Sequence, residues 1–255
     1  MYAAGRLQPA TDILRADESE FLAVAEGVFE TLLGGSWGLR DGAAHWARLR
    51  DGVANSGWER ALGEPVATLA ARVAESVPWR YARVRVAVGE RGRGVETWVS
   101  AQSWRPGRAG EAVALGVSAE AHPATSLRGV KSLAWRRTAL ALQQEHGTVF
   151  DVVVCDNRGR VQEGSRSSLF VRLGDRAVTP PLSDGCLPGT VRRRLLESGR
   201  VREETVSLDA LLGADEVAVA NSLAGVLPVR RIGEASIPVR DLAARLQETW
   251  LQEIE

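Results

Sequence analysis

Strand and helix patterns occur in two parts of this 255-residue chain, and a stretch without either pattern, residues 119–130, separates them. The signals are apolar periodicity bounded by glycine and proline. The expected strands are 28–33, 83–88, 95–103, 113–118, 150–156, 160–163, 168–173 and 216–220, and the expected helices are 44–56, 65–77, 132–146, 189–198 and 238–255. A chain of this length forms one large domain or two modest ones. We therefore expect the α/β class with two α+β domains, a smaller N-terminal domain over 1–118 and a larger C-terminal domain over 131–255, joined by the linker 119–130.

Charge and composition exclude several classes of function. The chain has 32 basic and 32 acidic residues, so it lacks the basic surplus with which a protein displaces counterions from nucleic acid. No apolar run reaches the length of a membrane span, and residues 1–16 lack the apolar core of a signal peptide. Cys155 and Cys186 fit no zinc spacing and the three histidines are scattered, so we expect no metal site. These features favour a cytoplasmic protein that acts on a small molecule, without nucleic acid or membrane partners.

Lys131 is the only lysine in the chain, and the other 31 basic residues are arginines. A GC-rich genome explains why arginine replaces lysine almost everywhere, but it does not explain the lysine that remains. Arginine can substitute for lysine on most surfaces, whereas its guanidinium stays protonated and cannot form a Schiff base. A single lysine can also be retained by chance, so the residues around it decide whether a primary amine is needed there.

Two further features follow Lys131 in an order that indicates a cofactor. Glu163 is a later carboxylate, and Leu187-Pro188-Gly189-Thr190 is a small-residue turn that enters a predicted helix. Backbone N–H groups at such a helix start bind phosphate. A lysine that holds an aldehyde, a carboxylate that keeps a pyridine nitrogen protonated and a helix start that neutralises a phosphate are what pyridoxal 5′-phosphate (PLP) requires. Each feature is weak alone, but their order together predicts PLP.

Six motifs follow one another along the chain: Gly27-Val28-Phe29-Glu30-Thr31-Leu32, His45-Trp46-Ala47-Arg48-Leu49, Val130-Lys131-Ser132-Leu133, the run 163–170, Gly185-Cys186-Leu187-Pro188-Gly189 and the run 221–229. Together they resemble the motifs of the fold-type IV PLP-dependent enzymes. This class IV aminotransferase superfamily includes branched-chain and D-amino-acid aminotransferases and aminodeoxychorismate lyase. The resemblance runs from about residue 27 to residue 229 and implies a D-amino-acid aminotransferase-like fold that holds PLP where its two domains meet. It also implies a homodimer.

The resemblance implies a role for each residue that matches a family motif. Lys131 should be the Schiff-base lysine and the general base and acid, and Glu163 should be the partner of the pyridine nitrogen. Thr31 is a candidate hydroxyl toward the substrate, and a threonine packed in a sheet is the equal alternative for this position. The residues implied to bind the cofactor phosphate, through side chains or backbone N–H groups, are Arg48, Gly189, Thr190, Val191 and Ser222.

The reaction is less sharply implied than the cofactor. The runs 179–182 and 221–229 and the compact length are similar to those of bacterial aminodeoxychorismate lyases, which form 4-aminobenzoate and pyruvate in folate biosynthesis. Lys131-Ser132-Leu133 is also similar to D-amino-acid aminotransferases, so an aminotransferase for branched-chain or D-amino acids is the alternative. A third hypothesis is a non-catalytic homologue.

Three positions depart from the family pattern and motivate that third hypothesis. Leu33 stands where a basic residue is usual, and Ala134 and Ser168 stand where asparagine is common. The retention of Lys131 and Glu163 argues against a non-catalytic chain. The sequence alone does not indicate which of the 31 arginines would bind substrate carboxylates.

Overall fold

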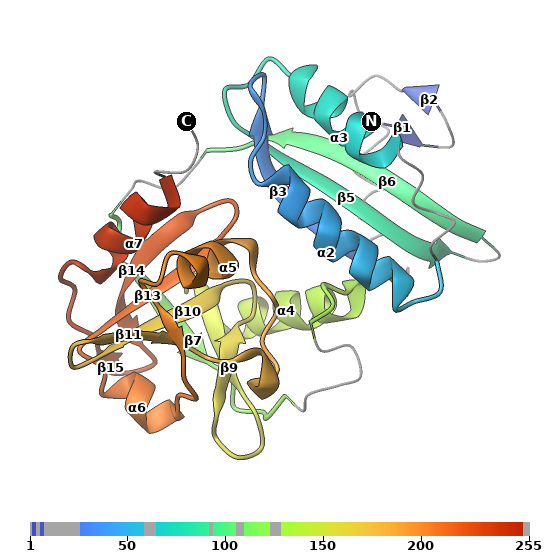
Figure 1. Ribbon diagram of the computed structural model, residues 1–255. Helices are drawn as coiled ribbons and strands as arrows, with labels where there is room; N and C mark the ends of the chain where they lie inside the picture. Colours follow the sequence, from blue (N-terminus) through green and yellow to red (C-terminus); the bar gives the residue numbers. More distant parts are fainter. Residues whose placement is uncertain are drawn as a thin grey trace. The chain divides into compact units, whose positions relative to one another are not determined.

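The computed structural model describes residues 2–3, 6–7, 26–58, 65–91, 94–105, 110–122 and 129–251. They form a mixed α/β structure, as the sequence predicts, with two sheets and helices packed on them (Figure 1). The chain divides into two compact units. Unit 1 comprises Met1–Pro106 and Val130–Arg137, and unit 2 comprises Gly107–Gly129 and Thr138–Glu255.

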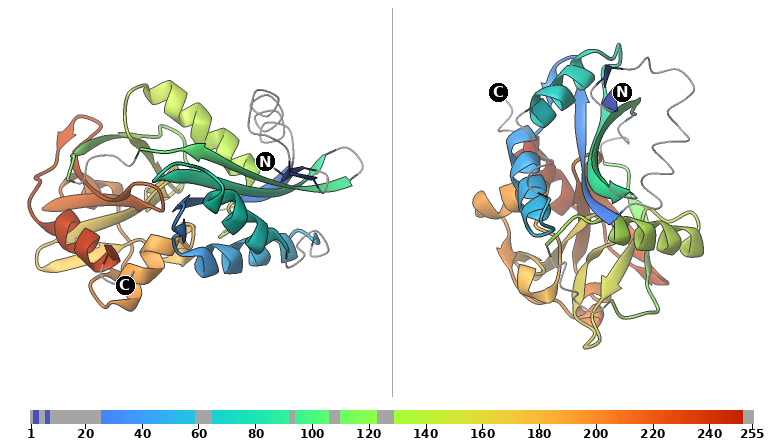
Figure 2. Two further views of the ribbon diagram at one scale, coloured as in Figure 1. Left: turned by 90° about the horizontal axis from the view of Figure 1, so that it is seen from above. Right: turned by 90° about the vertical axis from the view of Figure 1, so that its right-hand side faces the viewer.

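Unit 1 contains a six-stranded sheet with the order β2-β1-β6-β5-β3-β4. Alternation in β5 puts Val84 and Val86 on the face that packs against two helices, and leaves Arg83 and Arg85 on the other face. Both helices lie on the same face of the sheet (Figure 2). The elements are β1 (Tyr2–Ala3), β2 (Arg6–Leu7), β3 (Glu26–Gly35), β4 (Gly38–Leu39), α2 (Gly42–Ala54), α3 (Pro65–Glu75), β5 (Ala82–Arg91) and β6 (Gly94–Ser103).

Unit 2 contains a nine-stranded sheet in which β12-β11-β10-β13-β14-β7-β8-β9 are neighbours in that order and β15 pairs with β14. The strands β9 and β10 are not neighbours on this path, but they contact each other. The strands are β7 (Val113–Val117), β8 (Asp151–Cys155), β9 (Val161–Gly164), β10 (Ser168–Leu173), β11 (Arg176–Thr179), β12 (Arg202–Glu203), β13 (Glu216–Asn221), β14 (Gly225–Ile232) and β15 (Ala235–Ser236). The helices are the short 3-10 turn η2 (Leu182–Asp184), α5 (Thr190–Glu197), α6 (Leu208–Leu212) and α7 (Leu242–Leu251). Helix α4 (Leu133–His146) begins in unit 1 and continues in unit 2.

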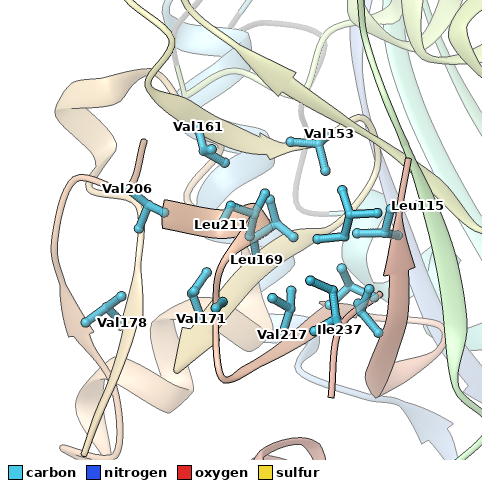
Figure 3. Close-up of a cluster of buried hydrophobic side chains, with 14 of the residues drawn as sticks. Leu115, Val153, Val161, Leu169, Val171, Val178, Val206, Leu211, Val217 and Ile237 are labelled. Atoms are coloured by element: carbon cyan, nitrogen blue, oxygen red, sulfur yellow. The ribbon is translucent and has the colours of Figure 1, made fainter. Parts of the chain in front are cut away.

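The core of unit 2 lies on both faces of this sheet. One cluster consists of branched aliphatic side chains from the strands, among them Val153, Leu169 and Val217 (Figure 3). The other packs Phe170 against α5 and α7. The runs of apolar residues in β8 and β13 reflect this burial, because a strand covered on both faces loses its apolar–polar alternation.

The boundary between the units differs from the expected one in two places. Strand β7 was expected in the N-terminal domain, but it pairs in parallel with β8 and β14 and therefore belongs to unit 2. Residues 131–137 were expected in the C-terminal domain, but the Lys131 segment hydrogen-bonds to β3 and Leu133 packs on Phe29, which keeps this segment in unit 1. Residues 123–128 of the expected linker lie outside the described part of the chain.

Among the helices of the described ranges, none is both long enough and apolar enough to cross a lipid bilayer.

Candidate active site

Lys131 lies beside strand β3. The backbone N–H of Phe29 donates to the Lys131 carbonyl at 2.9 Å, and Ser132 forms an isolated β-bridge with Val28. The Ser132 hydroxyl then accepts from the N–H of Trp135 at 3.1 Å and caps α4. Backbone contacts on both sides therefore fix the position of Lys131, and its Nζ lies 4.9 Å from the centre of the Phe29 ring.

Arg48 belongs to a buried cluster with Glu30 and His45. Alternation in β3 points Glu30 to the helix-covered face of the sheet, where it is fully buried. Arg48 donates to it through two nitrogens, Nε to Oε1 at 2.6 Å and Nη2 to Oε2 at 2.7 Å. Nδ1 of His45 lies 2.7 Å from Oε2. Glu30 thus fixes the guanidinium of Arg48, which is only 10% exposed and is not an ordinary surface arginine.

The charge state of Glu30 follows from these contacts. Burial by itself raises the pKa of a carboxyl group, but the charge and hydrogen bonds of Arg48, together with His45, outweigh it and lower the pKa of Glu30 from 4.5 to about 2. Glu30 is therefore ionised at every pH at which the folded protein would act.

This lowered pKa predicts an acid-dependent loss of stability. Because the pKa of Glu30 is lower in the folded chain than its ordinary value, the stabilisation is complete above about pH 4.5 and is lost as the pH falls toward about 2. Glu30→Gln should lower the free energy of unfolding at pH 7 by about 3 kcal/mol and flatten its dependence on pH between about 5 and 2. Urea unfolding at several pH values measures both effects.

The same strand offers a control for this experiment. Glu26 pairs with Arg137 at 3.1 Å but is 72% exposed. Glu26→Gln should change the free energy of unfolding by less than about 1 kcal/mol. An effect of Glu30→Gln as small as that of Glu26→Gln would contradict the role given to the buried cluster.

Glu163 is the next-to-last residue of β9 in unit 2. One of its carboxylate oxygens, Oε2, accepts the N–H of Leu187 at 3.0 Å. Leu187 precedes α5 by only a few residues, so this hydrogen bond holds the turn before α5 next to the end of β9. The carboxylate expected to partner a pyridine nitrogen and the helix start expected to bind its phosphate are therefore adjacent.

The start of α5 is suited to an anion. Gly189 is the N-cap residue, and no side chain caps the helix there, whereas Ser207 caps α6 by accepting from Ala210 N at 3.1 Å. A Cβ atom at Gly189 would lie 2.7 Å from the Ser168 hydroxyl oxygen, so a larger residue there would displace the Ser168 side chain. The first turn of α5 also contains no acidic residue. The positive end of the helix dipole and its first N–H groups, at Thr190 and Val191, fit a phosphate.

Ser222 lies in the turn that connects β13 to β14. The side-chain oxygen of Asn221 shapes this turn by accepting the N–H groups of Leu223 at 3.0 Å and Ala224 at 2.9 Å. The pairing of Ser168 with Ala220 shows that this turn lies at the same end of the sheet as the start of β10. Unit 2 thus gathers Glu163, the start of α5 and Ser222 at one end of its sheet.

Unit 1 gathers the remaining predicted residues around β3. Lys131 contacts the strand at Phe29 and Arg48 pairs with it at Glu30. Thr31 lies on β3 opposite Arg85 of β5, on the face away from α2 and α3. Leu33, one of the three positions that depart from the family pattern, is buried on this same face.

Arg83 and Arg85 are candidate substrate-binding residues that the sequence did not single out. The register places Arg85 between Thr31 and Ser100, and Arg83 between Leu33 and Gln102. Arg83 also donates to the side-chain oxygen of Gln102. The signal in the sequence was the alternation of arginine and valine over 83–86, which predicts two guanidinium groups on one face of a strand.

The chain is similar to known proteins in both sequence and structure. The family model described as amino-transferase class IV matches residues 27–232. The chain is 34% identical to the "Probable branched-chain-amino-acid aminotransferase" of Thermotoga maritima over 106 residues. This aligned segment is 39% of this chain and 39% of the relative. It is 34% identical to the aminodeoxychorismate lyase of Vibrio harveyi over 118 residues. This aligned segment is 42% of this chain and 44% of the relative. The aligned parts therefore span less than half the length of either relative.

A solved structure covers more of the chain. The branched-chain aminotransferase of the thermophilic archaeon Thermoproteus uzoniensis superposes with a TM-score of 0.80 over 98% of this chain and 92% of its own, at 18% identity. At this identity the likeness concerns the fold alone, and it confirms the fold expected from the six motifs.

Proposed function

This chain belongs to the class IV amino-transferase family, and from that premise we propose that it is a PLP-dependent lyase that converts 4-amino-4-deoxychorismate to 4-aminobenzoate and pyruvate. The family uses PLP, and both aminotransferases and aminodeoxychorismate lyases are among the relatives of the chain. The choice of the lyase rests on one observation, the pair of arginines on the face of the unit 1 sheet that points away from α2 and α3.

That face suits a substrate with more than one carboxylate. Arg85 lies in register with Thr31 and Ser100, and Arg83 lies in register with Gln102, so two guanidinium groups stand among hydrogen-bonding side chains. Guanidinium groups bind carboxylates through paired hydrogen bonds. 4-Amino-4-deoxychorismate has two carboxylates. A branched-chain amino acid or D-alanine has one, whereas L-glutamate also has two, so the arginine pair favours a dicarboxylate substrate and the assays below separate the lyase from a glutamate-using aminotransferase.

The residues that would hold the cofactor fit it chemically. By the resemblance to the family, Lys131 would supply the primary amine for the aldehyde carbon, and the Glu163 carboxylate would hold the proton of the pyridine nitrogen. Arg48, the N–H groups at the start of α5 and the Ser222 hydroxyl would bind the phosphate. When bound, PLP supplies a protonated ring that spreads the negative charge formed when a proton leaves the substrate.

Lys131 would serve the lyase reaction as base and then as acid, because the substrate amine takes its place on the cofactor and leaves the lysine amine free. Its amine removes the proton from C4 of the substrate ring, the carbon that bears the amino group. The bond between C3 and the enolpyruvyl oxygen breaks, the ring becomes aromatic, and Lys131 returns a proton to the methylene carbon of the leaving group. The proton taken from C4 is replaced by the proton given to the methylene carbon, and the atoms of the substrate are all found in the two products. The reaction therefore needs no water, oxidant or second substrate.

Neutral replacements of the two arginines test the proposed substrate site. Each of Arg85→Gln and Arg83→Gln should raise KM for 4-amino-4-deoxychorismate by roughly 10-fold to 100-fold, because each loses a charge-assisted hydrogen bond. Steady-state assays with purified variants measure this. Arg50→Gln, an exposed arginine on α2, is the control and should leave KM unchanged. Unchanged KM values in both test variants would exclude the arginine pair from substrate binding.

The alternative reaction is transamination of branched-chain or D-amino acids. It would convert D-alanine, L-leucine or L-glutamate to a keto acid and leave the bound cofactor as its amine form, which absorbs at shorter wavelength. When these amino acids are mixed with the PLP-loaded protein, we expect this spectral change to be much slower than turnover of 4-amino-4-deoxychorismate. A rapid change with any of them, without lyase activity, would favour the aminotransferase.

We also infer a homodimer, which rests on the resemblance to the family alone. Sedimentation of the PLP-loaded protein over a range of concentrations measures its mass in solution. A mass of one chain at every concentration would exclude the dimer.

A further inference from the structure

A buried carboxyl group fills the turn that follows Glu163. Asp151 is the first residue of β8 and is fully buried. Its Oδ1 accepts the Ser165 hydroxyl at 2.6 Å and the N–H of Val152 at 2.8 Å. Its Oδ2 accepts the Ser167 hydroxyl and, at 3.3 Å, the N–H of Arg166. One side chain therefore holds three consecutive residues of the turn between β9 and β10.

The backbone of this turn closes tightly around that carboxyl group. Gly164 and Ser167 exchange backbone hydrogen bonds, at 2.8 Å from Gly164 N and 3.3 Å from Ser167 N. The N–H of Ser165 donates to the Val152 carbonyl at 2.8 Å. A Cβ atom at Gly164 would lie 2.4 Å from Oδ2 of Asp151, so a glycine is needed where the carboxyl group meets the chain.

The turn connects two residues of the candidate site. Glu163 immediately precedes Gly164, and Ser168, whose hydroxyl lies against Gly189 at the start of α5, immediately follows Ser167. A shift of the turn would therefore move both the carboxylate that partners the pyridine nitrogen and the side chain that packs against the phosphate-binding helix start.

We propose that Asp151 is a positioning residue, which acts on the cofactor through the Gly164–Ser167 turn by fixing Glu163 and Ser168. This inference rests on the proposed use of PLP, because Glu163 has a ring nitrogen to hold only if the cofactor binds. Its physical basis is that a buried carboxyl group without its hydrogen bonds is costly. The four donors that surround Asp151 are thus held in one arrangement. Burial also raises the pKa of Asp151, although the two serine hydroxyls oppose this effect.

Removing the carboxyl group should loosen the turn and weaken PLP binding. For Asp151→Ala we expect the dissociation constant of PLP, measured by titrating the apoprotein and following its tryptophan fluorescence, to rise roughly 10-fold to 100-fold, the range typical of residues that orient a ligand-binding group. Asp151→Asn keeps the shape and one acceptor oxygen and should lie between Asp151→Ala and the wild type.

Asp156 offers a matched control in the same strand region. Its Oδ1 accepts the N–H groups of Arg158 and Arg160, each at 2.9 Å, and so holds the turn between β8 and β9. Asp156→Asn disturbs a carboxylate-held turn away from Glu163 and should leave the PLP dissociation constant unchanged. An equal rise in both aspartate variants would overturn the proposal, because the effect would then be a general loosening of unit 2.

A double-variant cycle tests whether Asp151 acts through Glu163. In a Glu163→Gln background, Asp151→Ala should raise the PLP dissociation constant by a clearly smaller factor than in the wild-type background. An equal factor in both backgrounds, or a folded Asp151→Ala protein with wild-type PLP affinity, would overturn the proposal. If Asp151→Ala does not fold, Ser165→Ala and Ser167→Ala each remove one donor and should raise the constant in the same direction. Wild-type PLP affinity in both serine variants would then overturn the proposal.

Failure of the wild-type protein to bind PLP would instead refute the proposed function.

Discussion

Lys131→Arg is expected to abolish both product formation and the visible absorption of bound PLP. Arginine keeps the positive charge, but its guanidinium neither bonds to the aldehyde nor exchanges a proton near neutral pH. The loss of general acid and base catalysis alone should cost roughly 10²-fold to 10⁴-fold in kcat. Spectra of the purified protein with added PLP and assays of both products measure these effects.

The single lysine of the chain allows an unusually clean control. Arg136→Lys in the Lys131→Arg background restores one lysine, five residues further along the same segment, and should restore neither colour nor activity. Reduction of the wild-type protein with borohydride should attach the cofactor to Lys131, because no other lysine side chain is present. A wild-type protein that PLP cannot colour would favour the non-catalytic homologue.

Glu163→Gln should cause the second largest loss, roughly 10²-fold in kcat, on the scale of a removed electrostatic contact at the reacting group. The amide can still accept the N–H of Leu187, so the turn should persist, but a neutral side chain no longer stabilises a protonated pyridine nitrogen. The effect should appear mainly in kcat and in the pH dependence of the visible spectrum.

Two further variants complete this measurement. Glu163→Asp keeps the charge and should retain more activity than Glu163→Gln. Glu197→Gln, at an exposed glutamate of α5, should have no effect on kcat. If Glu163→Gln retains wild-type kcat and an unchanged spectrum, Glu163 is not the partner of the ring nitrogen.

Local patterns predicted the elements whose residues alternate or cap clearly. The arginine–valine alternation predicted β5, and the apolar residues 152–155 predicted β8. Strand β14 was not predicted, because Pro228 removes a backbone donor and argues against a central strand. The structure accommodates Pro228 because β14 pairs with β7 only from Val229 onward, with an irregular register there.

The division into units depends on long-range pairing that local patterns do not contain. The sequence around β7 predicts a strand but not the sheet it joins, and its partners β8 and β14 come later in the chain. The same limit applies to the Lys131 segment, whose backbone pairs with β3 about a hundred residues earlier.

The residues of the candidate site also fall into those that the sequence could predict and those that it could not. Lys131, Glu163 and Gly189 could be predicted because their residue types and order match a chemistry. Glu30 and Asp151 could not be, because a carboxylate is usually exposed and only the tertiary structure shows it buried among donors. The signal for Glu30 was faint, a charged residue at an inward position of an otherwise apolar strand.

The most direct test of the proposed function is to supply 4-amino-4-deoxychorismate to the PLP-loaded protein and quantify pyruvate and 4-aminobenzoate together. We expect equal amounts of both products, matching the substrate consumed, and neither product with Lys131→Arg. If neither forms with the wild-type protein, while D-alanine, L-leucine or L-glutamate converts the bound cofactor to its amine form, the chain is an aminotransferase and the lyase proposal is wrong.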